Sequence, residues 1–373
     1  MTDLFDIPKL GFGLMRLPEK DGEIDLAALN GMVDEFLNNG FTYFDTAFVY
    51  HGGRSEKAFK SAVVKRYPRE KFTIATKLPA WELKSKDDLQ RIFDEQLSRT
   101  GAGYFDFYLL HSIEEAHLKT YDKFDCWQWA QKMKEQGLIR HFGFSFHDTP
   151  ELLDKALKEH PEVDFVQLQI NYIDWENKIV HSGGCYNTAR KHNKPIFVME
   201  PVKGGMLSSM RPELEEKLKA AAPKLSIASW AMRYCLSLEG VAVVLSGMST
   251  MEQVADNIAT VKNFAPFSQR EKICLDEVAK EYLSTPIIGC TGCKYCVEGC
   301  PANINIPGII SAYNTILTYG DHMRPHFYYG AITGGGGKAG SCAKCSQCES
   351  VCPQHLQITE ILEKASGVFD KKR

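Results

Sequence analysis

No stretch of the 373-residue chain approaches the run of about 18 apolar residues that a membrane-spanning helix needs. The N-terminal residues, MTDLFDIPKL, lack the basic segment and apolar run of a secretory signal. The charged residues are scattered and sum to a formal net charge of -3, with no block of one sign. These absences predict a cytoplasmic protein that binds neither membranes nor nucleic acid, and whose partners are small molecules or proteins.

Short apolar runs alternate with segments of helical periodicity between about residues 8 and 250, which is the pattern of repeated βα units. Eight strands are predicted, one near Gly11 and the others ending at Asp45, Lys77, His111, Ser145, Asn171, Glu200 and Gly247. Helices are predicted at 26–38, 55–66, 86–100, 124–136, 150–159, 185–192, 225–238 and 251–261. No G-x-G-x-x-G follows the first strand, so an α/β fold with a (β/α)8 barrel is favoured over a doubly wound sheet.

The composition changes to Cys, Gly and Pro after a further predicted helix at 268–283. We therefore expect a barrel domain at 1–284 and a small, mainly helical domain at 285–373, with helices in IPGIISAYNTIL and ITEILEKA. The segment TGGGGKAG lacks the first glycine of a phosphate loop and the Ser or Thr that should follow Lys338. It is predicted to be a plain loop.

Eight of the 12 cysteines lie in two runs of the form C-x-x-C-x-x-C-x-x-x-C-P, the pattern of bacterial ferredoxins. Zinc sites favour paired C-x-x-C knuckles, so the third cysteine and the Cys-Pro in each run favour two 4Fe-4S clusters. In that pattern the fourth cysteine of each run binds the other cluster. One cluster is then assigned to Cys290, Cys293, Cys296 and Cys352, and the second to Cys342, Cys345, Cys348 and Cys300. The four isolated cysteines are expected to pack in the core: Cys126, Cys185, Cys235 and Cys274.

Catalytic groups of a (β/α)8 barrel lie at the carboxyl ends of its strands, where Asp45, Lys77 and His111 are predicted, with Tyr50 in the loop after Asp45. The segment FDTAFVYHGGRSE, the lysine strand ATK and the histidine strand LLHS resemble the motifs of the aldo-keto reductases. The resemblance extends over about residues 8–265. It implies reduction of an aldehyde or ketone with a nicotinamide nucleotide.

The resemblance gives each of these four residues a role. Tyr50 would donate the proton to the substrate oxygen, and the Lys77 ammonium would favour loss of that proton. Asp45 would hold Lys77 in place, and His111 would donate a hydrogen bond to the same oxygen as a neutral imidazole.

The resemblance also implies the residues that contact the nucleotide. Those near the carboxamide would be Ser145, Gln169 and Asn171; those near the pyrophosphate, Pro201, Lys203 and Gly204; and those near the adenosine phosphate, Ser246, Gly247, Met248, Gln253 and Asn257. The basic residue that usually binds the 2'-phosphate is missing, because Ser249, Thr250 and Gln253 stand there, so the cofactor is NADP or NAD. The ring-stacking aromatic is replaced by Met199 or Glu200, which leaves room for a flavin.

A nicotinamide passes two electrons together, whereas a 4Fe-4S cluster passes one at a time. Three arrangements stay open: a flavin adapter, clusters that only order the barrel, and a ferredoxin-like electron-transfer partner. The alternative function is a ferredoxin- or flavin-linked redox protein whose barrel is not a carbonyl reductase. The substrate is expected to contact the loops at 117–125 and 172–184, with Trp127 and Trp175 as candidate lining residues.

Overall fold

The computed structural model describes residues 4–321 and 323–370, which form two compact units. The first unit contains the chain through Val202 together with Ala228–Phe267. The second contains Lys203–Ile227 together with the chain from Ser268 onward. The sequence-predicted boundary between residues 284 and 285 falls inside the second unit, and the domain division at that point stays a prediction.

The described part of the first unit contains eight parallel strands that close into a barrel, as the sequence predicts. Around the barrel they follow the order β1-β10-β9-β8-β7-β6-β5-β4. Their bounds are β1 Leu10–Gly13, β4 Tyr43–Asp45, β5 Thr73–Pro79, β6 Phe105–Ile113, β7 Ile139–Phe146, β8 Phe165–Gln169, β9 Ile196–Met199 and β10 Val241–Gly247. A small antiparallel hairpin, β2 Glu19–Lys20 and β3 Glu23–Ile24, follows β1.

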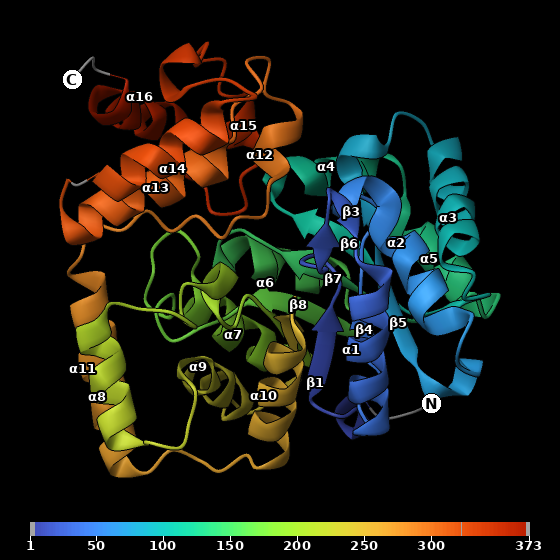
Figure 1. Cartoon of the computed structure of the whole chain (residues 1–373). Helices are drawn as coiled ribbons and strands as arrows, with labels where there is room; N and C mark the ends of the chain where they lie inside the picture. The colour runs from blue at the N-terminus through green and yellow to red at the C-terminus, as the bar shows by residue number, and fades with distance from the viewer. Residues whose placement is uncertain (1–3, 322, 371–373) are drawn as a thin grey trace. The chain divides into compact units, whose positions relative to one another are not determined.

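Helices surround these strands (Figure 1). They are α1 Leu26–Asn38, α2 Arg54–Phe59, α3 Asp87–Thr100, α4 Glu115–Lys123, α5 Cys126–Glu135, α6 Pro150–Glu159, α7 Ser182–Lys191, α9 Ile227–Leu236 and α10 Met251–Lys262. Short helical turns are η1 Leu4–Asp6, η2 Tyr50–Gly53, η3 Lys60–Val64, η4 Arg69–Lys71 and η5 Ala80–Glu82. The prediction that 117–125 is a loop is wrong, because α4 occupies most of it. The predicted helix at 55–66 is shorter, since α2 passes into the π-type turn η3.

Side chains before several helices satisfy backbone N–H groups that have no partner within the helix. Asp25 accepts from two such groups at the start of α1, and Thr149 and Thr250 each accept from one at α6 and α10. Ser268 and Glu271 form a reciprocal capping box at the start of a helix in the second unit. These caps explain why the predicted helix starts are close to the observed ones.

The barrel interior is filled by large apolar side chains. Tyr43, Phe107, Phe165 and Phe197 pack together there, with ring centroids 4.5–5.5 Å apart. Gly11 leaves them room, because a Cβ at this position would lie 2.5 Å from Leu245 Cδ2. A packed interior confines the chemistry to the loops at the carboxyl ends of the strands.

The second unit is mainly helical in its described part. Its elements are η6 Lys203–Gly205, α8 Pro212–Ala221, α11 Gln269–Leu283, α12 Tyr295–Glu298, α13 Ile306–Tyr319, α14 Met323–Thr333, η7 Ala339–Ser341, α15 Gln347–Ser350 and α16 Ile358–Phe369. Helices α8 and α11 lie side by side, as do α13 and α14 (Figure 1). Across both units, none of the helices described is long and apolar enough to cross a lipid bilayer.

Candidate active site

A buried ion pair lies at the carboxyl end of the barrel. Asp45 is the last residue of β4, and Lys77 comes two residues before the end of β5. Lys77 Nζ lies 2.6 Å from Asp45 Oδ1 and donates a second hydrogen bond to Thr46 O at 2.7 Å. Burial lowers the pKa of Lys77 and raises the pKa of Asp45, and the ion pair opposes both shifts. The ammonium is therefore fixed in place by two acceptors.

Tyr50 meets this pair from the loop between β4 and α2. Its hydroxyl lies 3.4 Å from Lys77 Nζ, which also lies 4.9 Å from the centre of the phenol ring. The loop is anchored below Tyr50, where Ser55 Oγ donates to Leu14 O at 2.9 Å and lies 2.8 Å from Thr46 Oγ1. This anchoring gives the phenol a defined position beside the ammonium.

His111 also lies beside the phenol, two residues before the end of β6. The two rings meet edge to face, with their centroids 6.0 Å apart. Burial lowers the pKa of His111 well below its ordinary value, and Lys77 adds to the shift. The imidazole is neutral at neutral pH and carries one N–H donor. The structure thus brings together the four residues that the sequence singles out.

Tyr121, which the sequence does not single out, holds the ends of two of these strands. Its hydroxyl lies 2.7 Å from both Leu78 O and His111 O and donates to one of them. The residue comes from α4, in a segment for which the sequence predicts a loop. Recognition of that helix is the signal that would have found it.

A second buried network lies behind Lys77. Glu56 Oε1 accepts from Thr76 Oγ1 at 2.8 Å and from Gln96 Nε2 at 3.2 Å, while Arg99 Nη1 lies 3.4 Å from Oε2. Gln96 Nε2 also lies 3.0 Å from Lys77 O. Burial raises the pKa of Glu56 to about 7, against the hydrogen bonds, which lower it.

Two residues predicted to lie near the carboxamide are buried at strand ends. Ser145 lies in β7, and its Oγ accepts a hydrogen bond from Ser112 N at 2.7 Å. Gln169 is the last residue of β8, and its carbonyl oxygen accepts from Ser182 Oγ at 2.7 Å. Both lie at the same end of the barrel as Lys77.

Asn171 lies outside β8, so the prediction that this strand ends there is wrong. Its Nδ2 lies 2.8 Å from Asp174 Oδ2 and 3.2 Å from Glu200 O. Its Oδ1 accepts from Ile173 N at 3.1 Å and Asp174 N at 2.9 Å. The amide thus shapes a turn, and its contact with a nucleotide stays a prediction.

The segment predicted to hold the adenosine phosphate follows β10. Asn257 Nδ2 donates to Ser246 Oγ at 2.7 Å, and Gln253 Oε1 accepts from Ser249 N at 2.7 Å. Met248 is fully buried in the hydrophobic core. The exposed polar groups of this segment are thus concentrated at the N-terminus of α10.

Arg16 supplies a positive charge next to this segment, and the sequence reading missed it. Its side-chain carbons lie 3.5–3.6 Å from the position of a Cβ at Gly247, and its carbonyl accepts from Ser249 Oγ at 2.7 Å. Arg16 Nη2 lies 3.1 Å from Glu200 Oε1. Because Arg16 is more than 200 residues away in sequence, no local motif identifies it.

The three residues predicted near the pyrophosphate fall in both units. Pro201 is buried in the first unit, whereas Lys203 and Gly204 belong to the second, in η6. A shared role for the three at one nucleotide stays a prediction.

The eight clustered cysteines line two small cavities in the second unit. Cys290, Cys293, Cys296 and Cys352 line one, and Cys300, Cys342, Cys345 and Cys348 line the other. This grouping is the crossed arrangement that the sequence pattern predicts. Burial raises the pKa of the Cys296 thiol, and the neighbouring thiols of the same cavity add to the shift.

The isolated cysteines differ among themselves. Cys126, Cys185 and Cys235 are buried, as predicted, and burial raises the pKa of the first two thiols to about 12. Cys274 is only half-buried, so the prediction of core packing is wrong there.

The tryptophans also depart from expectation. Trp127 is buried in the core and stacks on His160 with ring centroids 3.7 Å apart, so it does not line a substrate site. Trp175 packs against Tyr186 and stays a candidate. Trp81, which the sequence reading missed, is 42% exposed and lies 5.2 Å from His111 between ring centres.

A closed parallel barrel with a tyrosine, lysine, aspartate and histidine gathered at the carboxyl ends of its strands defines a (β/α)8-barrel oxidoreductase. Residues 9–280 match the model of the aldo/keto reductase family, and the chain belongs to that family. It is an NAD(P)-dependent oxidoreductase of the aldo-keto reductase type. Residues 289–357 match the model of a 4Fe-4S dicluster domain.

Named relatives resemble the barrel. The chain is 29% identical over 286 residues to the uncharacterized oxidoreductase YqkF of Bacillus subtilis, covering 69% of this chain and 88% of the relative. The structure of aldo-keto reductase AKR11C1 from Bacillus halodurans is 25% identical, with a TM-score of 0.55, covering 72% of this chain and 91% of that one. An aldo-keto reductase from Klebsiella pneumoniae, solved in complex with NADPH, is 21% identical with a TM-score of 0.57, covering 73% and 91%.

Proposed function

We propose that this protein reduces an aldehyde or ketone with NADPH or NADH at the site formed by Asp45, Tyr50, Lys77 and His111. The observation that carries the proposal is the position of Lys77 Nζ, 2.6 Å from Asp45 Oδ1 and 3.4 Å from the Tyr50 hydroxyl. A buried ammonium held by a carboxylate and facing a phenol suits proton donation to a carbonyl oxygen.

Each of the four residues has its own role at the carbonyl oxygen of the substrate. A bound nicotinamide nucleotide would supply hydride to the carbonyl carbon. Tyr50 donates its hydroxyl proton to the oxygen, and the Lys77 ammonium stabilises the phenolate left behind. His111, neutral through burial, donates a hydrogen bond to the same oxygen and stabilises the charge that develops there. Asp45 keeps Lys77 in position.

The proposed nucleotide site extends from the strand ends to α10. Ser145 and Gln169 would hold the carboxamide, with Asn171 shaping the turn beside them. Toward the pyrophosphate we assign Pro201, Lys203 and Gly204, and toward the adenosine phosphate Ser246, Gly247, Met248, Gln253 and Asn257. The N-terminus of α10 favours anionic oxygens, and Arg16 adds a cation next to it.

The test replaces Tyr50 with Phe. Turnover of an aldehyde such as methylglyoxal is expected to fall by about 10² to 10⁴, because the proton donor is lost while the ring remains. The dissociation constant for NADPH, followed by nucleotide fluorescence, is expected to stay unchanged. A Tyr50→Phe protein that turns over at the normal rate would rule out this role.

We propose further that the two cysteine cavities hold two 4Fe-4S clusters. Each cavity offers four thiols and an otherwise mostly apolar wall, including Ile306, which lines both. Four cysteine thiolates are the usual ligands of a 4Fe-4S cluster. The clusters would supply one-electron transfer. A cytoplasmic location stays a prediction.

A ferredoxin- or flavin-linked function in which the barrel does not reduce carbonyls is the second candidate. Exposure of the second cysteine loop favours a protein partner, since Ala343, Lys344, Cys345, Ser346 and Gln347 are all exposed. Nucleotide titration separates the two functions. A barrel that quenches neither NADPH nor NADH fluorescence would support the second candidate.

A further inference from the structure

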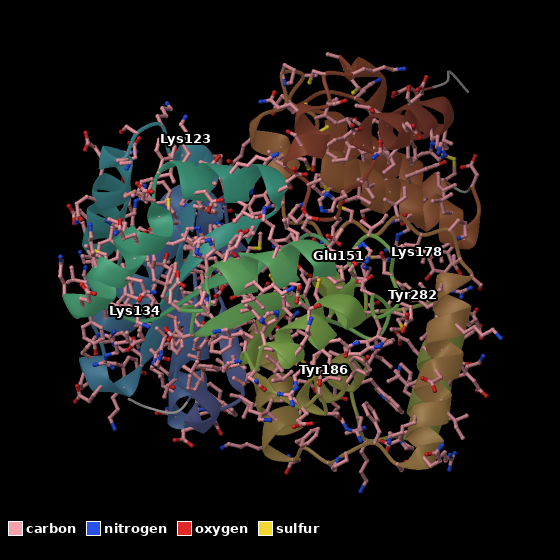
Figure 2. All side chains as sticks on the ribbon, turned by 180° about the vertical axis from the view of Figure 1, so that it is seen from behind. Lys123, Lys134, Glu151, Lys178, Tyr186 and Tyr282 are labelled. Atoms are coloured by element: carbon pink, nitrogen blue, oxygen red, sulfur yellow. The ribbon has the colours of Figure 1, made fainter. Side chains whose placement is uncertain are left out.

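A cavity of about 580 Å³ lies in the second unit. Of the described residues that line it, Gly204 alone also belongs to the proposed nucleotide site. Three segments form it: the connector 204–211, the first cysteine loop from Ile287 to Gly292, and one face of α13. Tyr282, at the end of α11, closes one side, and Figure 2 shows this residue. The volume is in the range of small-molecule sites, about 300 to 1,000 Å³.

The cavity shares a wall with the first cysteine cavity. Cys290, Thr291, Pro307 and Ile310 line both. A molecule in the larger cavity would therefore be separated from the group held by Cys290 by a single layer of residues. That proximity suits electron exchange between the two.

The walls are held in place by contacts within the unit. Asn314 Oδ1 accepts from Ile288 N at 2.9 Å, and its Nδ2 donates to Ile288 O at 2.8 Å, which ties α13 to the first cysteine loop. Gly204 has a positive φ of 64° and packs so closely that a Cβ there would lie 2.4 Å from Thr291 O. The connector and the cysteine loop thus form one packed wall.

The walls combine apolar and polar side chains with one charge. Met206, Met210 and Ile287 give flexible apolar surface, and thioethers pack well against aromatic rings. Arg211 is the one charged residue among the described residues that line the cavity, and its Nη2 donates to Glu281 O at 3.2 Å. Apolar surface, several hydroxyl groups and a guanidinium together suit a ring with polar substituents that carries an anionic group.

We propose that this cavity binds a planar, conjugated redox ring of the flavin or quinone kind, which exchanges electrons with the group held by Cys290. Full reduction of the ring takes two electrons and two protons. Two reduced 4Fe-4S clusters supply one electron each and are oxidised, water supplies the protons, and an iron–sulfur donor protein reduces the clusters again. The exposed second cysteine loop gives that protein its point of contact.

The test measures FMN binding to the holoprotein, reconstituted anaerobically with iron and sulfide. Quenching of FMN fluorescence is expected to saturate at one FMN per chain. Thr315→Trp places an indole in the cavity from α13 and is expected to weaken FMN binding by about tenfold or more. Leu317→Trp, on the same helix but outside the cavity lining, is the matched control and is expected to bind FMN as the wild type does.

A second variant that fills the cavity is needed in case Thr315→Trp loses its iron–sulfur centre. Ser209→Trp fills the cavity from the opposite wall, at an exposed position of the connector. Arg211→Gln is expected to weaken FMN binding by about tenfold and riboflavin binding much less, because only FMN carries a phosphate. Displacement of FMN by menadione would show that the cavity recognises the conjugated ring itself. Failure of menadione to displace FMN would show that the natural ligand is a flavin and not a quinone.

Reoxidation of the reduced protein gives an independent readout. After removal of dithionite, reoxidation by FMN is expected to saturate at the concentration that half-fills the site, and to slow in Thr315→Trp. The proposal is wrong if neither FMN nor menadione binds saturably, or if FMN binds equally well when both walls carry tryptophan. Tyr50→Phe is expected to leave FMN binding intact. Failure of the FMN-binding proposal can therefore be distinguished from failure of the carbonyl-reduction proposal.

Discussion

Arg16 Nη2 lies 3.1 Å from Glu200 Oε1, an ion pair between the loop after β1 and the residue after β9. Both side chains are mostly shielded from solvent, so the guanidinium has a defined position. The pair places a cation beside Gly247, in a segment that carries no basic residue of its own. The charge that local sequence lacks is thus supplied from a distant part of the chain.

Replacement of Arg16 by Gln is expected to weaken NADPH binding on the order of tenfold, because a charge-assisted hydrogen bond to an anionic oxygen is lost. Fluorescence titration with NADPH and NADH measures the effect. Arg54→Gln is the control, since it removes an exposed ion pair with Glu23 in the same unit and should leave both affinities unchanged. Equal NADPH affinity in Arg16→Gln and the wild type would exclude the residue from the nucleotide site.

Replacement of Asp45 by Asn is expected to cost about 3 to 5 kcal/mol of unfolding free energy, because the Lys77 ammonium is left buried without its carboxylate. Urea unfolding measures the loss. Lys77→Met combined with Asp45→Asn is expected to cost clearly less than the sum of the two single changes, since no uncompensated charge remains. Additive losses would mean that the two side chains do not interact.

The barrel and its four central residues were predictable because the information is local. Buried strands alternate with amphipathic helices, and the loop from Asp45 through Tyr50 to Ser55 is a contiguous motif. The cysteine groups follow from the repeated C-x-x-C-x-x-C-x-x-x-C-P pattern, in which the fourth cysteine of each run joins the other group. Even the exchange of the fourth cysteines agrees with the cavities that the structure shows.

What sequence reading missed depends on contacts between distant segments. Arg16 and Tyr121 reach the site from elements with no motif of their own. Helix α8 buries only Leu214 and Leu218, which is too few for a clear periodic pattern, and α14 exposes Phe327 and Met323, so its apolar residues do not mark a buried face. The shared wall between two cavities exists only after the chain has folded.

Glu56→Gln tests the buried network behind Lys77. Burial raises the pKa of Glu56 from 4.5 to about 7. Between pH 4.5 and about 7, the folded chain retains a proton on Glu56 that the unfolded chain has released. The contribution of Glu56 to the free energy of unfolding therefore falls by up to about 3 kcal/mol as the pH rises through this range. Because glutamine does not titrate, the free energy of unfolding of Glu56→Gln is expected to fall less with rising pH than that of the wild type.

Urea unfolding at about pH 5 and about pH 7.5 measures the decline in both proteins. Glu95→Gln, on the helix that carries Arg99 but with its side chain partly exposed, provides the control and should retain the wild-type slope. Identical pH slopes in the wild type and Glu56→Gln would show that the carboxyl does not titrate in this range.

The crossed pairing of cysteines predicts which substitutions act on the same cluster. Cys352→Ser and Cys293→Ser line one cavity, so either change is expected to lower iron from about eight to about four atoms per chain, and the double variant should fall no further. The double variant Cys352→Ser and Cys345→Ser changes one cysteine of each cavity, and it is expected to remove nearly all of the iron. Iron and acid-labile sulfide analysis measures both, with half-buried Cys274→Ser as the neutral control. The reverse result, in which Cys352 and Cys345 act on one cluster, would mean that each run of cysteines binds its own.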